Sequence, residues 1–211
     1  MKVISYSYQE DKSLEDQVVY CARVSNPTSQ SNNLNNQKLI TYLMEHGHWS
    51  PFEMVSICLE IETSRDIARQ ILRHRSFSFQ EFSQRYATPS LDFKKREIRL
   101  QDQKNRQNSI VTDDESLKRK WNEKQDEVAH AVHQAYSWAI QNGVAKEQAR
   151  VVLPEGMTQT RMYMNGTLRS WIHYIQARSG EDTQKEHREV AIACAHAIQP
   201  LFPSILNFVK Q

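Results

Sequence analysis

The sequence lacks any long hydrophobic run. Its 211 residues contain no apolar window of about 18 residues, so we expect no segment that crosses a membrane. Residues Met1 to Tyr6 lack an apolar signal core, and we therefore expect a cytoplasmic protein. Glycine (5) and proline (6) are scarce, and no repeat, linker or low-complexity tract interrupts the chain. The length then favours a single domain, residues 1–211, with a sizeable core.

The sequence also has few cysteines and a small net charge. The three cysteines, Cys21, Cys58 and Cys194, are widely separated and lie in apolar periodic segments. We interpret them as small buried side chains, because none has an obvious local base that would make it a nucleophile. The net charge of +2 is too small to indicate nucleic-acid binding by itself. With 39% hydrophobic and 25% charged residues, the composition is typical of a soluble globular protein.

The hydrophobic pattern predicts long helices and a few strands. Strands are expected at 2–8, 55–61 and 158–164, and helices at 13–24, 64–72, 114–141, 145–152, 167–178 and 183–199, with a further helix ending at 46. Residues 88–113 look irregular apart from a short strand near 97–100, and the polar segment 101–109 is interpreted as a flexible loop. Because the strands do not alternate with helices as βαβ units, the pattern indicates an α+β fold.

The most informative stretch is residues 73–85, Arg-His-Arg-Ser-Phe-Ser-Phe-Gln-Glu-Phe-Ser-Gln-Arg. Arg73, His74 and Arg75 follow an apolar helix, whereas a solvated helix face would normally mix charge signs at i,i+4 spacing. Arginine recognises phosphate and carboxylate groups through its planar fork. The cluster therefore predicts an anion site. From these residues alone, a solvated helix end or a nucleic-acid contact remains open.

This stretch resembles the signature of the flavin-dependent thymidylate synthases, Arg-His-Arg followed after seven residues by Ser. The resemblance extends to five motifs in the family's order, at 46–53 (His-Gly-His-Trp-Ser-Pro-Phe-Glu), 68–70 (Ala-Arg-Gln), 73–86, 147–154 (Glu-Gln-Ala-Arg-Val-Val-Leu-Pro) and 169–178. These motifs reach from about Cys21 to the C-terminus. One short motif would be weak, whereas five in order are specific.

The resemblance implies both architecture and chemistry. The implied fold is α+β, with long helices packed on a small, mostly antiparallel sheet, assembling as a homotetramer with active sites shared between subunits. The implied reaction is the reductive methylation of dUMP to dTMP, with FAD as cofactor, methylenetetrahydrofolate as carbon donor and NADPH as reductant. The protein's part would be positional and electrostatic, because the cofactor carries the redox chemistry. The resemblance does not identify the residues that bind folate and NADPH.

The resemblance also implies the site residues. Arg178 is the implied catalytic residue, at the pyrimidine imide, where a guanidinium would stabilise negative charge. The implied dUMP contacts are Gln70, Arg73, Glu81, Phe82, Ser83, Gln84, Arg85, Arg150 and Arg178. The implied FAD contacts are His48, Ser50, Arg73, His74, Arg75, Glu81, Thr167, Leu168, Arg169 and His173. Ser83 is assigned to binding rather than to nucleophilic attack, since no neighbouring base is evident. Gln84 stands where many members have a small residue, and Thr167 and His173 where many have Asn.

Two other functions remain as alternatives. A single-strand nucleic-acid binder would use Arg73 and Arg75, with Phe77, Phe79 and Phe82 as stacking platforms. A metal-dependent hydrolase would be built on His46, His48 and His74. The His46–His48 pair lacks a third ligand at a recognisable spacing, so we expect no metal site. His130 and His133 lie on a charged helix and are interpreted as surface residues.

Overall fold

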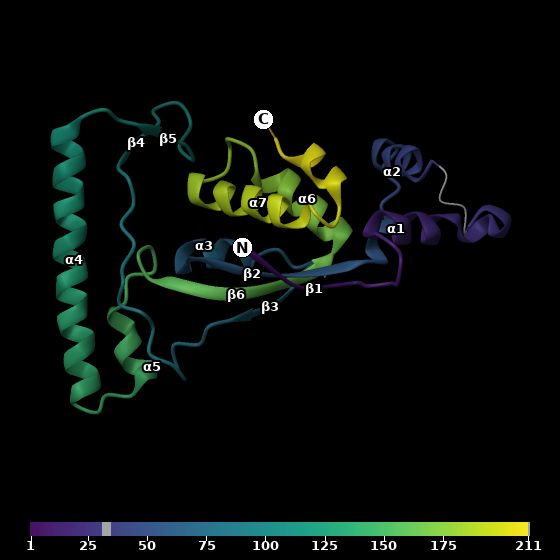
Figure 1. Ribbon diagram of the computed structural model, residues 1–211. Helices are drawn as coiled ribbons and strands as arrows, with labels where there is room; N and C mark the ends of the chain where they lie inside the picture. The colour runs from purple at the N-terminus through teal and green to yellow at the C-terminus, as the bar shows by residue number, and fades with distance from the viewer. Residues whose placement is uncertain (31–34, 211) are drawn as a thin grey trace.

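The centre of the molecule is a four-stranded antiparallel sheet. The structure is a computed structural model that describes residues 1–30 and 35–210. The strand order is β1 (Lys2–Tyr6), β2 (Ser56–Ser64), β6 (Gln159–Thr167) and β3 (Ser78–Glu81) (Figure 1). β2 and β6 pair along their whole length, from Ser56 opposite Thr167 to Ser64 opposite Gln159. Apolar side chains alternate with polar ones in both strands, which is the pattern of a sheet with one buried face.

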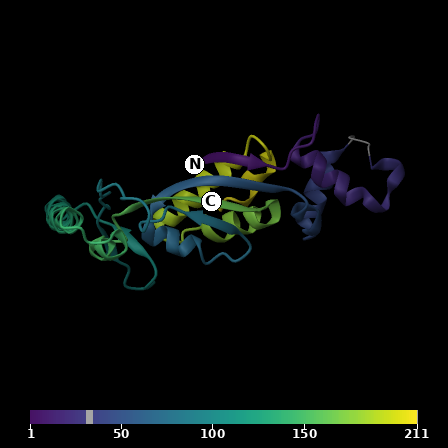
Figure 2. The ribbon, with the colours of Figure 1, turned by 90° about the horizontal axis from the view of Figure 1, so that it is seen from below.

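One face of the sheet carries the main core. Helices α6 (Leu168–Arg178) and α7 (Lys185–Ile198) lie over this face in both views (Figures 1 and 2), and the 3-10 helix η5 (Pro203–Phe208) follows α7. Trp171 of α6 is fully buried there, and its indole N–H donates to the carbonyl of Ile57 at 3.0 Å. The opposite face carries polar side chains such as Glu62 and Arg161, which form an ion pair at 2.6 Å. The alternation along β2 and β6 therefore decides which face α6 covers.

The remaining helices extend the molecule at both ends (Figure 1). One end holds α1 (Leu14–Ala22), η1 (Arg23–Ser25), η2 (Pro27–Ser29) and α2 (Asn36–Glu45). The other holds α4 (Glu115–Gln141), α5 (Lys146–Ala149) and η4 (Arg150–Val152), with a smaller core of Tyr136, Ala139, Ala149 and Leu153. The hairpin of β4 (Arg99–Gln101) and β5 (Ser109–Val111) lies near the start of α4. In the sequence, η3 (Ser50–Glu53) precedes β2 and α3 (Arg65–Ile71) follows it.

The α+β class and most of the predicted elements are confirmed. At the start of α1, Ser13 and Asp16 form the expected capping box: Ser13 Oγ accepts from the Asp16 N–H at 3.1 Å, and the Asp16 carboxylate accepts from the Ser13 N–H at 3.0 Å. The sequence pattern did not predict β3 or β5, and β4 begins two residues later than expected. Segment 101–109, predicted as a loop, forms the hairpin turn between β4 and β5.

Candidate functional site

The first group of predicted site residues surrounds the loop after α3. We call Arg73, His74, Arg75 and Arg178 the guanidinium cluster. Within residues 1–30 and 35–210, the Arg73 and Arg75 side chains are exposed and form no hydrogen bond or ion pair. Arg178, at the last position of α6, donates from Nε to His74 Nε2 at 3.1 Å. The cluster therefore holds three guanidiniums without a carboxylate partner among the described residues, which suits an anionic ligand.

The contact with Arg178 sets the protonation of His74. An arginine Nε–H can only donate, so His74 Nε2 must accept and the ring must be neutral. Burial lowers the pKa of His74, and the positive charge of Arg178 lowers it further. The ring also packs edge-on against Tyr174, with centroids 4.9 Å apart. His74 is thus a neutral support for Arg178 and does not add a fourth charge.

Glu81, at the end of β3, is neutralised inside the protein. Its carboxylate accepts from Arg65 at 3.2 Å, from Thr160 at 3.0 Å and from Arg69 at 3.4 Å. Burial lowers the pKa of Arg65, while the charge of Glu81 opposes that shift. The pair joins the start of α3 to the end of β3, and Glu81 directs its charge toward these arginines.

Next to Glu81 lies a cavity of about 390 Å³, which we call the anion cavity. It is lined by Arg65, Arg69, Gln84, Glu147, Gln148, Arg150, Val151, Leu153 and Glu155. Gln84 is 4% exposed, and its amide nitrogen has no hydrogen-bond partner among the residues that the structure describes. A buried donor without a partner costs about 1–3 kcal/mol, and an acceptor group of a ligand would relieve that cost.

Charge around the anion cavity favours the same kind of ligand. Arg65, Arg69 and Arg150 line it together with two glutamates, and Glu147 is already paired with Arg85 at 3.3 Å. Ser83 Oγ accepts from the Arg85 N–H at 3.3 Å, so the 83–85 turn brings these side chains to the rim. The excess of guanidinium groups and the unpartnered Gln84 amide together fit a phosphate.

A second group of predicted site residues lies where η3 contacts the start of α6, and we call this surface the η3–α6 face. Arg169 forms an ion pair with Glu53, and His173 packs edge-on against Trp49 with centroids 4.9 Å apart. Burial lowers the pKa of His173, with a smaller contribution from Arg169. His48 and Ser50 are exposed on this face.

Thr167 and Leu168 have structural contacts within the fold. The Thr167 hydroxyl caps α6 by accepting from the Ser170 N–H at 3.2 Å. Leu168 is fully buried, and its N–H donates to the carbonyl of Val55 at 2.9 Å.

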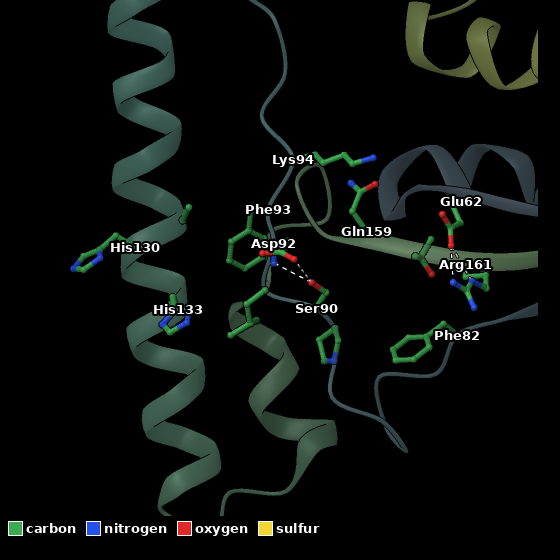
Figure 3. Close-up of a pocket in the computed structure, with 14 residues that line it drawn as sticks. Glu62, Phe82, Ser90, Asp92, Phe93, Lys94, His130, His133, Gln159 and Arg161 are labelled. Atoms are coloured by element: carbon green, nitrogen blue, oxygen red, sulfur yellow. Dashed lines mark hydrogen bonds and ion pairs between the residues drawn. The ribbon is translucent and has the colours of Figure 1, made fainter. Parts of the chain in front are cut away.

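Phe82 belongs to a different cavity, of about 880 Å³, between the sheet and α4 (Figure 3). Its N–H donates to the carbonyl of Arg161 at 2.9 Å, which continues the pairing of β3 with β6. His130 and His133 of α4 are among the residues that line this cavity (Figure 3). His130 and His133 are exposed, as predicted.

Phe77, the first predicted stacking platform, is part of the core. It is 8% exposed and packs edge-on against Trp171 with centroids 4.9 Å apart. Phe79 and Phe82 are half-buried. In the nucleic-acid alternative, the buried Phe77 could therefore not serve as a stacking platform.

The cysteines and the paired histidines carry little site chemistry. Burial raises the pKa of the fully buried Cys194 thiol to about 12 and also raises that of Cys58. Cys21 and Cys58 are only half-buried, so the prediction of buried side chains is wrong for these two. Across the described residues, no group of three or more His, Cys, Asp or Glu side chains could hold a metal ion. Among the same residues, no helix is long and apolar enough to span a membrane.

The predicted residues thus gather in separate groups. Among residues 1–30 and 35–210, no side-chain hydrogen bond or ion pair joins the guanidinium cluster to the anion cavity. Gln70 instead bonds to Gln184 at 2.8 Å and to His187 at 3.2 Å. Sequence reasoning missed Arg65, Tyr174, Gln184, Glu186 and His187. Arg65, Tyr174 and His187 are buried polar side chains whose partners are distant in the chain. Gln184 and Glu186 are half-buried and bond to each other across two residues, and their other partners are distant in the chain.

Comparison with known proteins gives a consistent result. The sequence profile of the family described as thymidylate synthase complementing protein matches residues 2–204. The chain is 50% identical over 196 residues to a flavin-dependent thymidylate synthase of Synechocystis, covering 93% of this chain and 89% of that one. It is 47% identical over 191 residues to a probable flavin-dependent thymidylate synthase of Paramecium bursaria Chlorella virus 1, covering 90% and 88%.

Solved structures share the fold. A UMP/dUMP methylase from Streptomyces cacaoi, bound with 5-Br UMP, superposes with a TM-score of 0.84 at 24% identity. The match covers 98% of this chain and 91% of that one.

Proposed function

The chain belongs to the family of flavin-dependent thymidylate synthases and is an FAD-dependent methyltransferase, and we propose that it converts dUMP to dTMP with methylenetetrahydrofolate as carbon donor and NADPH as reductant. The observation that supports this most is the unneutralised guanidinium cluster. Arg73, Arg75 and Arg178 lack a carboxylate partner within the described residues, although the protein ion-pairs many of its other arginines.

We place the phosphate of dUMP in the anion cavity. Arg150 and Arg85 would neutralise it, and the Ser83 hydroxyl and the backbone of the 83–85 turn would donate hydrogen bonds. The unpartnered amide of Gln84 supports this assignment, because it supplies a donor where the family often has a small residue. The other proposed dUMP contacts are Gln70, Arg73, Glu81, Phe82 and Arg178. Since Arg65 and Arg69 already neutralise Glu81, we give Glu81 the task of holding those arginines.

We place FAD against the guanidinium cluster and the η3–α6 face. Arg73 and Arg75 fit its pyrophosphate because neither has a carboxylate partner in the described part of the chain, and His74 remains a neutral neighbour. The other proposed contacts are His48, Ser50, Glu81, Thr167, Leu168, Arg169 and His173. Bound there, the flavin would supply the reducing electrons of the reaction.

We assign catalysis to Arg178. Its Nε is held by His74, so its two terminal nitrogens are positioned in advance. Facing the pyrimidine imide, they would stabilise the negative charge that builds on the ring more than they stabilise the resting substrate. His74 would keep the guanidinium in place without competing for that charge.

We further propose that the sites are completed between copies of the chain in a homotetramer. The guanidinium cluster and the anion cavity are separate groups in one chain, yet both carry residues assigned to dUMP. Two copies would bring one of each together. The single domain, residues 1–211, would be the repeated unit.

The test is product formation from dUMP with each component omitted in turn. We expect dTMP by mass spectrometry only when protein, FAD, NADPH and methylenetetrahydrofolate are all present, and a yellow flavoprotein after addition of FAD. A folded protein that takes up no flavin, or flavin-loaded protein that forms no dTMP, would refute the proposal. Steep salt-dependent binding of single-stranded DNA without flavin uptake would instead favour the nucleic-acid alternative.

A further inference from the structure

A line of hydrogen-bonded side chains runs from the β4–β5 hairpin into the core beside the guanidinium cluster. We call it the polar chain, and its members are Arg99, Glu186, Gln184, Gln70, His187 and Tyr174. The hairpin contributes Arg99, whose Nη2 lies 2.6 Å from Glu186 Oε1. Helix α7 and the residue before it contribute Glu186, Gln184 and His187.

The carboxylate of Glu186 fixes the direction of the first links. An ionised carboxylate only accepts, so Gln184 must turn its amide nitrogen toward Glu186 Oε2, at 2.9 Å. The Gln184 carbonyl then faces Gln70 and must accept from its Nε2 at 2.8 Å. This leaves the carbonyl end of the Gln70 amide toward His187. The carboxylate is ionised because hydrogen bonds from Gln184 and Arg99 lower the pKa of Glu186 against the opposing effect of burial.

The direction of donation stays the same toward the core. Gln70 Oε1 lies 3.2 Å from His187 Nδ1, so Nδ1 must carry the proton. His187 Nε2 is then free to accept from the Tyr174 hydroxyl, also at 3.2 Å. His187 is 1% exposed, and both of its ring nitrogens are used. Every hydrogen bond from Tyr174 to Glu186 therefore donates in one direction.

We propose that Glu186, acting through Gln184, is a positioning residue that fixes the amide orientation of Gln70 and the protonated nitrogen of His187. Gln70 then presents one remaining amide hydrogen and one remaining carbonyl lone pair in fixed places. This inference rests on the proposed function to the extent that Gln70 contacts dUMP. The chain of donors itself depends only on this structure.

The key variant is Glu186→Gln, which keeps the size of the side chain but can present either a donor or an acceptor to Gln184. Its matched control is Glu97→Gln, because Glu97 also pairs with Arg99 (3.0 Å) and with Lys185 (2.6 Å) but lies outside the polar chain. We expect E186Q to raise the KM for dUMP about tenfold, the scale of one oriented hydrogen bond, while kcat stays within about twofold. E97Q should leave the KM unchanged. Equal effects of the two variants on KM would overturn the proposal.

A second pair of variants separates the two nitrogens of His187. Asn places its amide near Nδ1 and keeps a donor for Gln70, whereas Gln places its amide near Nε2 and keeps only the partner of Tyr174. His187→Gln should therefore raise the KM for dUMP, and His187→Asn should not. The reverse order, or equal KM values at equal thermal stability, would contradict the proposal.

Ring 13C NMR of labelled histidine reads the result without any activity. We expect His187 of the wild-type FAD-loaded enzyme in the Nδ1–H tautomer and a mixture of tautomers in E186Q. A wild-type Nε2–H tautomer would overturn the inference. If the wild-type enzyme neither binds nor methylates dUMP, the proposed function fails, while this spectrum still decides the polar chain.

Discussion

At the scale of single residues, the nitrogens of the Arg178 guanidinium have two different roles. Its Nε donates to the neutral His74, while its terminal nitrogens form no hydrogen bond to the described part of the chain. A free arginine side chain would lose rotamer entropy on binding a ligand, and the contact with His74 removes part of that cost in advance.

Arg178→Ala should slow methylation by roughly 10²–10³-fold, the usual scale for removing one preorganised electrostatic donor. Arg178→Lys should not restore the full rate, because an ammonium is a point charge rather than a planar fork. The checks are single-turnover rate, dUMP affinity and flavin occupancy, and we expect flavin occupancy to stay near normal. Turnover near that of the wild type would remove Arg178 from the mechanism, and loss of flavin with dUMP binding intact would assign it to the other ligand.

His187 makes stability depend on pH. Burial, with smaller contributions from Arg178 and His74, lowers its pKa from 6.5 to about 4. As pH falls below 6.5, the unfolded chain takes up a proton that the folded chain excludes, so stability present above pH 6.5 is progressively lost toward pH 4. The loss should approach roughly 3 kcal/mol at the acid end.

Urea unfolding of wild type and His187→Asn between pH 7.5 and 4.5 checks this. His74 and His173 have lowered pKa values as well, so the relevant quantity is the difference between the two proteins at each pH. We expect the wild type to lose more stability than the variant as pH falls. Parallel losses would mean that His187 titrates normally in the fold.

At the scale of elements, β6 and the residue that precedes β3 approach each other closely at Gly166. A Cβ added to Gly166 would stand 2.6 Å from Phe77 Cε1, well inside van der Waals contact. Phe77 in turn packs on Trp171 and stands two residues after Arg75. The strand, the aromatic core and the guanidinium cluster are therefore coupled through this position.

Gly166→Ala should destabilise the protein by about 1–3 kcal/mol, as overpacking of a dense core does. Gly156→Ala is the control, since a Cβ there would meet no atom within 4 Å, and we expect it to change stability by less than about 0.5 kcal/mol. Chemical denaturation measures both. Equal stabilities of the two variants would show that Phe77 moves aside at no cost.

Some of these elements could be predicted from the sequence, and others could not. Local signals predicted α1 through its capping box, β2 through its alternation and α4 through its length, because each depends on residues close together in the chain. β3 has only four residues and is formed by pairing with β6, about 80 positions away, so no local pattern marked it.

For the site, too, the sequence indicated residues within motifs but not their distant partners. Motif order indicated the guanidinium cluster, and Arg178 does contact His74, 104 residues earlier. The partners of Glu81 and Gln70 could not be predicted, because Thr160 and His187 reach them only after the sheet and α7 have folded. A polar residue at a buried position predicts that a hydrogen-bond partner exists, but the sequence alone does not identify that partner.

At the scale of the whole molecule, the two groups assigned to dUMP are carried by different parts of the chain. The guanidinium cluster lies in the loop after α3 and at the end of α6, whereas the anion cavity lies between Arg65 and Arg69 of α3 and the α5–η4 segment. We propose that Arg178 and Arg150 act on one nucleotide although they belong to separate groups in one chain. A shared site between copies would reconcile the two observations.

The most direct test co-expresses Arg150→Ala and Arg178→Ala chains under two different affinity tags and assays the doubly purified mixed oligomer for dTMP. Each variant alone should be nearly inactive. If every site takes Arg150 from one copy and Arg178 from another, random assembly restores both arginines in about a quarter of the sites, and we predict about a quarter of wild-type activity. If both arginines of a site came from one chain, every site would carry a defect, and a mixed oligomer as inactive as the single variants would contradict the account.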